Sequence, residues 1–278
     1  MIAPAVLNTR PRGQAKELTL LLRAAGFEPI EAPCVEVVGA WDPAEVARVL
    51  ASLRASAYEW VVFPSSNAVG FFMEALAEAG GSAADLARAR VLSGPGTARA
   101  VAQHRLRVDR VLARFSAAAA LDILREQPLG SRGVLLPRAA EGREELVDGL
   151  RERSIRVDDP VVYCTQPTHP HGLRAAAEFL RDRKVAAVTL TSPSAARALV
   201  DGLKAMGADA SGYFATVPVV CIGETTAGTV RSLGLEVARV AQETTLESLV
   251  EAVSDALSVR GVGASPCPNP RVASEVRS

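Results

Sequence analysis

The sequence predicts an α/β fold of two parallel-sheet lobes, joined by a two-stranded hinge and separated by a cleft. Three observations lead to this prediction. Short apolar runs alternate with amphipathic helical stretches along the 278 residues. Those runs lack the polar alternation of a half-exposed strand, which is typical of parallel strands covered by helices on both faces. Landmarks of the first half also recur in the second half at a nearly constant spacing. The combination indicates lobes of Rossmann or flavodoxin type.

Strands and helices alternate from the N-terminus onward. A helix is expected after the first apolar run because Leu18 and Leu22 recur at helical spacing, with Gly26 as its end. Other helices are expected over 67–80, from about Thr97 and from about Glu141. The runs expected to form strands are AVLNT (5–9), WVVFPSS (60–66), ARVLSG (89–94), GVLLPR (133–138), VVYCT (161–165), AAVTLTS (186–192), PVVCIG (218–223) and LEVARV (235–240).

Three pairs of landmarks indicate an internal duplication. Each pair joins a similar turn after an apolar run, and the three spacings agree within two residues. Such agreement is the signature of a repeated structural unit. The pairs are Arg10 with Arg138, Ser65 with Ser192, and Gly94 with Gly223, at spacings of 128, 127 and 129 residues.

Two segments are candidates for crossings between the lobes. Residues 34–43 and 161–172 each combine a β-like run with Pro and Gly breakers. If both cross, the first lobe is discontinuous and holds 1–38 plus 170–258, and the second lobe holds 40–162. The tail, 259–278, has no periodicity and carries Gly, Pro and Ser, so we expect it to be disordered.

Composition narrows the class of partner. Lys+Arg and Asp+Glu balance at 31 each, whereas a nucleic-acid-binding surface is markedly basic. The N-terminal stretch has no signal-peptide pattern, and no apolar run is long enough to cross a bilayer. We therefore expect a cytoplasmic protein, and a monomer, with no nucleic-acid or membrane partner.

The cysteines and histidines give no metal signature. Four cysteines, at 34, 164, 221 and 267, form no C-x-x-C pair. His169 and His171 flank Pro170 in an expected linker, where they are either a solvated loop or a metal pair. We expect no metal site.

Polar side chains cluster where the expected strands end. In parallel sheets ligands bind beyond these ends, where helix N-termini offer free N–H groups. Each residue alone reads as a helix cap or as an anion ligand, and the two arginines as structural partners of strand-end carbonyls. Together they suit a ligand with several carboxylates or phosphates. The candidates are Thr9, Arg10, Ser65, Ser66, Asn67, Gly94, Gly96, Thr97, Arg138, Thr191, Ser192, Ser194, Thr225 and Thr226.

Common catalytic and cofactor motifs are absent from the sequence. Gly94-Pro95-Gly96 lacks the rest of the G-x-G-x-x-G pattern, and there is no P-loop lysine. There is also no G-x-S-x-G elbow and no H-E-x-x-H. An enzyme with this sequence is expected to work by positioning and electrostatics.

Seven motifs taken in order resemble the uroporphyrinogen-III synthase family. The resemblance covers about residues 5–255, and Glu224 departs from it, because the family often has Pro there. The motifs are TRPRGQ (9–14), WVVFPSSNAVGFF (60–72), SGPGTARAV (93–101), VLLPRAAEGREEL (134–146), VVYCTQP (161–167), LTSPSAARAL (190–199) and VCIGETTAGTV (220–230).

The resemblance implies a two-lobed fold and an activity. The family's substrate is hydroxymethylbilane, a linear tetrapyrrole with eight carboxylates. The enzyme removes its hydroxyl as water, inverts the last pyrrole ring and closes the macrocycle, without cofactor or metal. From the residues alone, Tyr163 is either an aromatic side chain that packs at the hinge or a hydroxyl donor that faces the cleft. By resemblance it is the catalytic residue, either a general acid or an orienting donor, and Ser192, Thr225 and Thr226 match cleft positions.

Two other functions stay open at this point. A family member without activity, acting as a two-lobed ligand-binding or regulatory protein, has the same sequence features. A nucleotide-sugar transferase also has two Rossmann lobes, but no acidic ribose-binding residue or basic phosphate cluster is evident.

Overall fold

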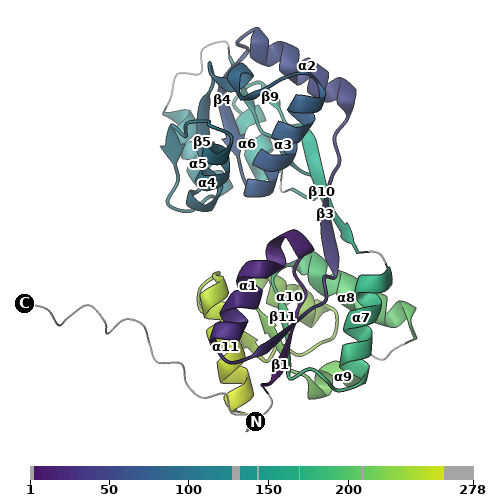
Figure 1. Cartoon of the computed structure of the whole chain (residues 1–278). Helices are drawn as coiled ribbons and strands as arrows, with labels where there is room; N and C mark the ends of the chain where they lie inside the picture. The colour runs from purple at the N-terminus through teal and green to yellow at the C-terminus, as the bar shows by residue number, and fades with distance from the viewer. Residues whose placement is uncertain (1–2, 127–131, 143, 169, 208–209, 260–278) are drawn as a thin grey trace, which may run out of the picture. The chain divides into compact units, whose positions relative to one another are not determined.

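The chain folds into two compact units (Figure 1). The computed structural model describes residues 3–126, 132–142, 144–168, 170–207 and 210–259. Unit 1 comprises Met1–Glu36 and Gln166–Ser278, and unit 2 comprises Val37–Thr165. The chain therefore passes between units twice, next to residues 36 and 165. The tail that we expect to be disordered lies outside the described residues, apart from Val259 at the end of the last helix.

Unit 1 has a parallel five-stranded sheet with the order β13-β12-β11-β1-β2. Successive side chains of a strand face opposite sides of a sheet. Val6 thus packs with α1 and α11, and Leu7 with α7 and α8. The strands are β1 (Ala5–Asn8), β2 (Glu28–Glu31), β11 (Ala187–Leu190), β12 (Val219–Cys221) and β13 (Arg239–Val240), and the helices are α1 (Arg12–Ala24), α7 (Pro170–Arg181), α8 (Pro193–Ala205), α9 (Ala210–Thr216), α10 (Glu224–Ser232) and α11 (Leu246–Ser258).

Unit 2 has a second parallel sheet with the order β6-β5-β4-β7-β9. Val61 and Phe63 of β4 pack with α2 and α3, whereas Trp60 and Val62 pack with α5 and α6. The strands are β4 (Tyr58–Phe63), β5 (Arg90–Ser93), β6 (Arg110–Val111), β7 (Gly133–Leu135) and β9 (Val157–Asp158), and the helices are α2 (Pro43–Arg54), α3 (Ser66–Glu78), the short 3₁₀ helix Ala83–Leu86, α4 (Pro95–Gln103), α5 (Ala117–Arg125) and α6 (Glu145–Arg151).

The two sheets repeat one another in space. Reading each sheet from one edge places β12 with β5, β11 with β4, and β1 with β7. These are the strands before the three landmark pairs of the sequence, so the duplication is confirmed. When the strands are numbered within each unit and read from this same edge, the order is 5-4-3-1-2 in unit 1 and 3-2-1-4-5 in unit 2. The two orders differ because unit 2 begins with the strand that corresponds to the third strand of unit 1.

A small three-stranded sheet accompanies the crossings. Its order is β3-β10-β8, from β3 (Val35–Gly39), β10 (Val161–Pro167) and β8 (Arg138–Ala139). The strand expected over 133–138 is in fact two strands, β7 and β8. Strand β7 ends at Leu135, Pro137 has no N–H for a ladder, and the helix expected near residue 141 begins at Glu145 instead. None of the described helices is long and apolar enough to cross a membrane.

Candidate functional site

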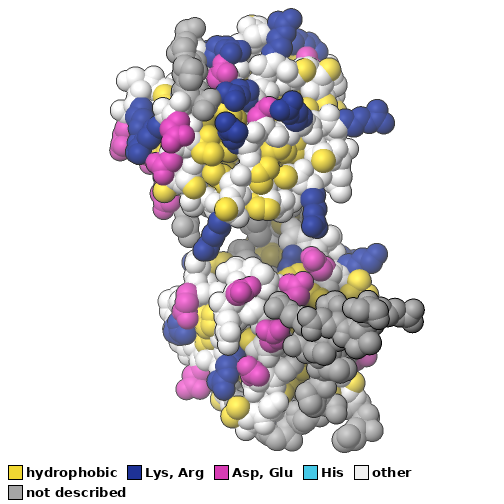
Figure 2. Space-filling model, turned by 90° about the vertical axis from the view of Figure 1, so that its left-hand side faces the viewer, with side chains coloured by type: hydrophobic (Ala, Val, Ile, Leu, Met, Phe, Trp, Pro, Cys, Tyr) yellow, Lys and Arg dark blue, Asp and Glu magenta, His cyan; other side chains and the backbone are white. Residues whose placement is uncertain are grey.

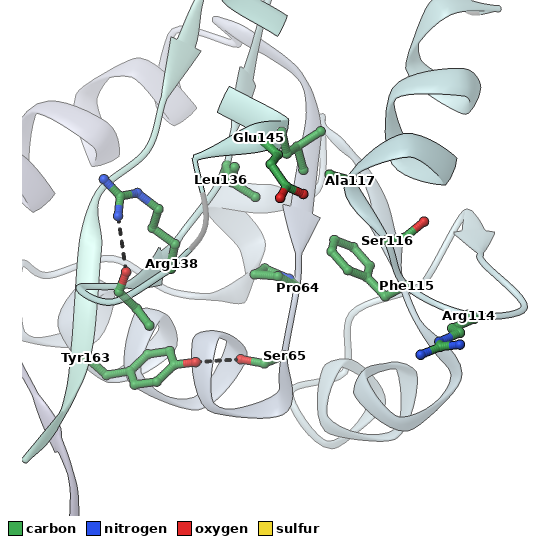
Figure 3. Close-up of a pocket in the computed structure, with 13 residues that line it drawn as sticks. Pro64, Ser65, Arg114, Phe115, Ser116, Ala117, Leu136, Arg138, Glu145 and Tyr163 are labelled. Atoms are coloured by element: carbon green, nitrogen blue, oxygen red, sulfur yellow. Dashed lines mark hydrogen bonds between the residues drawn. The ribbon is translucent and has the colours of Figure 1, made fainter. Parts of the chain in front are cut away.

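A cavity of about 500 Å³ lies at the carboxyl ends of the unit 2 strands (Figure 3). Between β4 and β7 the chain order of the sheet changes direction, and open α/β sheets bind ligands at such a switch point. The volume falls within the ~300–1,000 Å³ of small-molecule sites. Thirteen residues line the cavity: Pro64, Ser65, Arg114, Phe115, Ser116, Ala117, Leu136, Arg138, Ala139, Gly142, Glu145, Leu146 and Tyr163.

Ser65 and Tyr163 meet at one side of this cavity. Their hydroxyl oxygens are 3.0 Å apart, and either group can be the donor. Ser65 is also the N-cap of α3, because its Oγ accepts from the Ala68 amide at 3.1 Å. The ring of Tyr163 stacks on Phe71 with a centroid distance of 5.6 Å. Backbone pairing of β10 with Ala139 and Ala140 fixes the position of Tyr163 along the strand.

The surroundings keep the Tyr163 phenol protonated. Burial raises its pKa above the ordinary value, the charge of Glu141 raises it further, and the hydrogen bond with Ser65 opposes the shift. Burial disfavours a phenolate because the charged form loses its hydration. At neutral pH the group is therefore a neutral hydroxyl that can donate a hydrogen bond into the cavity.

Arg138 lines the cavity and already has a carboxylate partner. Its Nε donates to Asp159 Oδ2 at 2.9 Å, and a terminal nitrogen donates to the Ala139 carbonyl at 3.2 Å. The other oxygen of Asp159 accepts from Arg151 at 2.9 Å. These contacts agree with the reading of Arg138 as a partner of strand-end carbonyls.

The loop after β6 supplies cavity residues that sequence reasoning missed. Arg114, Phe115 and Ser116 come from this loop, and Glu145 comes from the first turn of α6. Strand β6 is only two exposed residues long, so no apolar run marks its end. The one usable signal was Ser116, which caps α5 by accepting from the Ala119 amide at 3.2 Å.

Gly94 has a structural reason to be glycine. It is the N-cap of α4, and a Cβ added there would lie 3.1 Å from the Cβ of Phe115. The missing side chain thus allows the Phe115 loop to approach the end of β5.

The remaining unit 2 candidates lie at the starts of α3 and α4. Ser66 Oγ donates to the Gly96 carbonyl at 3.3 Å, so the two helix starts are in contact. Thr97 is buried in the first turn of α4, and Asn67 lies in the first turn of α3.

The unit 1 candidates occupy the equivalent edge of their own sheet. Thr9 is fully buried, and its hydroxyl donates to the Thr189 carbonyl at 2.8 Å. Ser192 caps α8 through the Ala195 amide, and its hydroxyl lies 3.1 Å from that of Ser194. Thr191 precedes Ser192 at the end of β11, and in α10 Thr225 is exposed and Thr226 is buried.

Arg10 is a partly buried side chain of unit 1 with one unpaired polar atom among the described residues. Its amide donates to Asn8 Oδ1 at 3.2 Å, and a terminal nitrogen lies 3.4 Å from Gln14 Oε1. Its Nε is buried with no hydrogen-bond partner among the described residues. Burial lowers the pKa of this guanidinium, and the charge of Glu17 opposes that shift.

The described residues contain no cluster of three or more side chains able to hold a metal ion. His169 lies outside them.

Comparison with known proteins identifies the family. The sequence matches the family model for "Uroporphyrinogen-III synthase HemD" over residues 16–251. The chain belongs to the uroporphyrinogen-III synthase family. The resemblance drawn from the seven motifs is thereby confirmed.

Individual relatives agree with this family. Uroporphyrinogen-III synthase of Synechococcus elongatus is 28% identical over 260 residues, which cover 91% of this chain and 95% of the relative. The chloroplastic uroporphyrinogen-III synthase of Oryza sativa is 28% identical over 267 residues, which cover 93% and 82%.

Solved structures of uroporphyrinogen-III synthases share the fold. A mutant enzyme of Thermus thermophilus is 23% identical, with a TM-score of 0.61 over 92% of this chain and all of that one. The Helicobacter pylori protein is 19% identical, with a TM-score of 0.57 over 93% of this chain and all of that one. The α/β fold with two parallel sheets is therefore confirmed as that of uroporphyrinogen-III synthases.

Proposed function

We propose that this protein is a uroporphyrinogen-III synthase. It is a cyclising lyase of tetrapyrrole biosynthesis. It converts hydroxymethylbilane to uroporphyrinogen III, with loss of water and inversion of the last pyrrole ring. The observation that carries this proposal is the family match over residues 16–251. The cavity at the unit 2 switch point supports it, because it offers a partly buried hydroxyl pair and an apolar wall.

The chemistry asks mainly for control of shape. Direct closure of the linear substrate needs no enzyme, so the protein must hold a flexible chain in the bent form that allows ring inversion. A substrate with eight carboxylates can be held by main-chain amides and hydroxyls at helix starts. We assign this role to the strand-end residues of both units, including Ser65, Ser192 and Thr225.

Tyr163 is proposed to assist the departing hydroxyl. A general acid works best with a pKa near the operating pH, whereas burial raises the pKa of Tyr163 above its ordinary value. A neutral phenol of this kind suits hydrogen-bond donation to the leaving oxygen better than full proton transfer. Ser65, 3.0 Å away, orients the phenol.

Several finer expectations remain predictions. They are the cytoplasmic location, the monomeric state, the absence of nucleic-acid and membrane partners, and the absence of a cofactor. The proposed mechanism uses only side chains and main-chain amides of this chain.

A turnover assay tests the function. Pure protein is mixed with freshly prepared hydroxymethylbilane, and the type I and type III isomers are separated. We expect the type III isomer to dominate and its yield to scale with enzyme concentration. Type I product alone, at the spontaneous rate, would reject the synthase and favour the inactive ligand-binding alternative, which binds the substrate without converting it.

A further inference from the structure

The cavity of unit 2 carries two charged side chains that the mechanism above does not use. Arg114 comes from the loop before α5, and Glu145 from the first turn of α6. Figure 3 shows the two charged groups on different sides of the cavity. The Glu145 carboxylate points inward, and the Arg114 guanidinium lies beyond Phe115, on the side of the cavity away from Tyr163.

Within the described part of the chain, neither charge has a hydrogen-bond or ion-pair partner, and both side chains are exposed. Two other charged residues, one in the cavity and one close to Glu145 in the sequence, do have partners. Arg138 is paired with Asp159, and Glu141 accepts from the Thr165 amide at 2.9 Å. Among the described residues, Arg114 and Glu145 are thus the charged side chains of this cavity without a partner.

The wall between them is apolar. It is lined by Phe115, Leu136 and Leu146. Phe115 can lie close to the end of β5 because Gly94 has no side chain. A flat ring packs well against such a surface, because aromatic and aliphatic groups bury their faces together.

We propose that this cavity binds one pyrrole ring of the substrate in a single orientation. The ring packs against Phe115, its N–H donates to the Glu145 carboxylate, and the carboxylate of one of its acid arms pairs with the Arg114 guanidinium. The assignment rests on the proposed function, because it takes the ligand to be a linear tetrapyrrole. Reversing the ring would bring its carboxylate toward Glu145, which like-charge repulsion disfavours.

The segment that contains Arg114 is rich in arginine, which favours the approach of a polyanion to unit 2. Residues 86–121 contain a single acidic side chain, Asp109, which accepts from the Val91 amide and lies 3.7 Å from Arg107. Figure 2 shows Lys and Arg side chains surrounding a hydrophobic area on unit 2. A field of one sign attracts a polyanion to such a surface. The arginines of this segment are Arg88, Arg90, Arg99, Arg105, Arg107, Arg110 and Arg114.

Substitution of Arg114 tests the carboxylate contact. Arg114→Gln should lower kcat/KM for type III formation about 10- to 100-fold, because a charge-assisted hydrogen bond is lost. Arg114→Lys should lie between this variant and wild type. Arg48→Gln is the matched control, since Arg48 is equally exposed on α2 and does not line the cavity. Circular dichroism and thermal unfolding show whether each variant is folded.

Substrate analogues distinguish a direct contact of Arg114 with the substrate from a purely structural role of this residue. In each analogue one acid arm ends in a methyl group instead of a carboxylate. For one of them the Arg114→Gln variant should lose almost nothing relative to wild type, because the paired carboxylate is already missing. An equal loss with every analogue, or no loss relative to Arg48→Gln, overturns the Arg114 contact.

Glu145 is tested in the same assay. Glu145→Leu removes both charge and acceptor and should lower kcat/KM about 10-fold, whereas Glu145→Gln keeps an acceptor oxygen and should lose less. Glu74→Gln and Glu74→Leu, on the exposed face of α3, are the controls. Glu145→Leu with wild-type kcat/KM overturns the N–H contact. Failure of the wild-type protein to form the type III isomer instead rejects the proposed function itself.

Discussion

Tyr163 combines the three properties that the proposed reaction asks of a donor. It lines the cavity, its hydroxyl lies 3.0 Å from that of Ser65, and its ring is fixed by stacking on Phe71. A second buried tyrosine, Tyr58, offers a comparison within the same unit. Tyr58 donates to Asp158 at 2.6 Å and does not line the cavity. Tyr58 is therefore a structural control for the role proposed for Tyr163.

Tyr163→Phe should lower kcat about 10- to 100-fold with little change in KM, because the donor acts on the leaving oxygen in the transition state. Initial rates of type III formation measure this effect. Tyr58→Phe should reduce the free energy of unfolding and leave kcat near the wild-type value. An unchanged rate in Tyr163→Phe would remove Tyr163 from the mechanism.

The pH profile gives an independent check on Tyr163. Its neutral form is the active one, and its pKa lies above the ordinary value of ~10. The donor is therefore present at neutral pH and is lost only as pH rises through the raised pKa. We expect kcat to show no tyrosine-dependent decline between pH 7 and about 9.5. An alkaline inflection below pH 9 that disappears in Tyr163→Phe would contradict the raised pKa.

Among the secondary-structure elements, α3 begins directly after a residue, Ser65, that both caps the helix and contacts Tyr163. Ser65 caps this helix through the Ala68 amide and orients Tyr163 through the same hydroxyl. The equivalent serine of unit 1, Ser192, caps α8 in the same way. A residue required by the helix is thus placed at the switch point of the sheet, where ligands bind.

Ser65→Ala should cost about 1 kcal/mol of unfolding free energy, the usual cost of losing an N-cap side chain. Asp42→Ala is the matched control, because Asp42 caps α2 by accepting from the Ala44 amide at 2.9 Å and does not line the cavity. Urea unfolding followed by circular dichroism should give similar losses for both variants. Only Ser65→Ala should also lower kcat. Equal activity in the two variants would show that Ser65 has no role in catalysis beyond capping α3.

At the scale of the whole molecule, a neutral chain distributes its charge unevenly. Lys+Arg and Asp+Glu balance over the full sequence, yet residues 86–121 carry seven arginines and one acidic side chain. Net charge alone would therefore conceal an arginine-rich segment. The Debye length of the solution sets the distance over which these arginines attract a negatively charged substrate.

Raising the ionic strength from 0.01 to 0.15 M shortens the Debye length from about 30 to about 8 Å. We expect KM for hydroxymethylbilane to rise several-fold over this range while kcat changes little, because long-range attraction to the arginine-rich segment is screened. Steady-state kinetics at several salt concentrations measure this. A KM that does not depend on salt would mean that the segment takes no part in substrate capture.

The fold class, the duplication and the family could be predicted before any coordinates were known. Strand and helix positions follow from apolar runs and helical spacing, which neighbouring residues encode. The caps Ser65 and Ser192 were recognisable for the same reason, since capping is a local interaction. Errors arose where local signals were weak, as in the two-residue strand β6, or where a breaker was overlooked, as at Pro137.

Only the tertiary structure decided which of these residues share a site. Ser65 and Tyr163 are 98 positions apart and meet because β4 and β10 are placed by long-range pairing. The same packing brought Arg114 and Glu145 to one cavity and turned the hydroxyl of Thr9 inward to a neighbouring strand. The order of strands and the packing of helices set such distances, and the local pattern of side chains does not contain them.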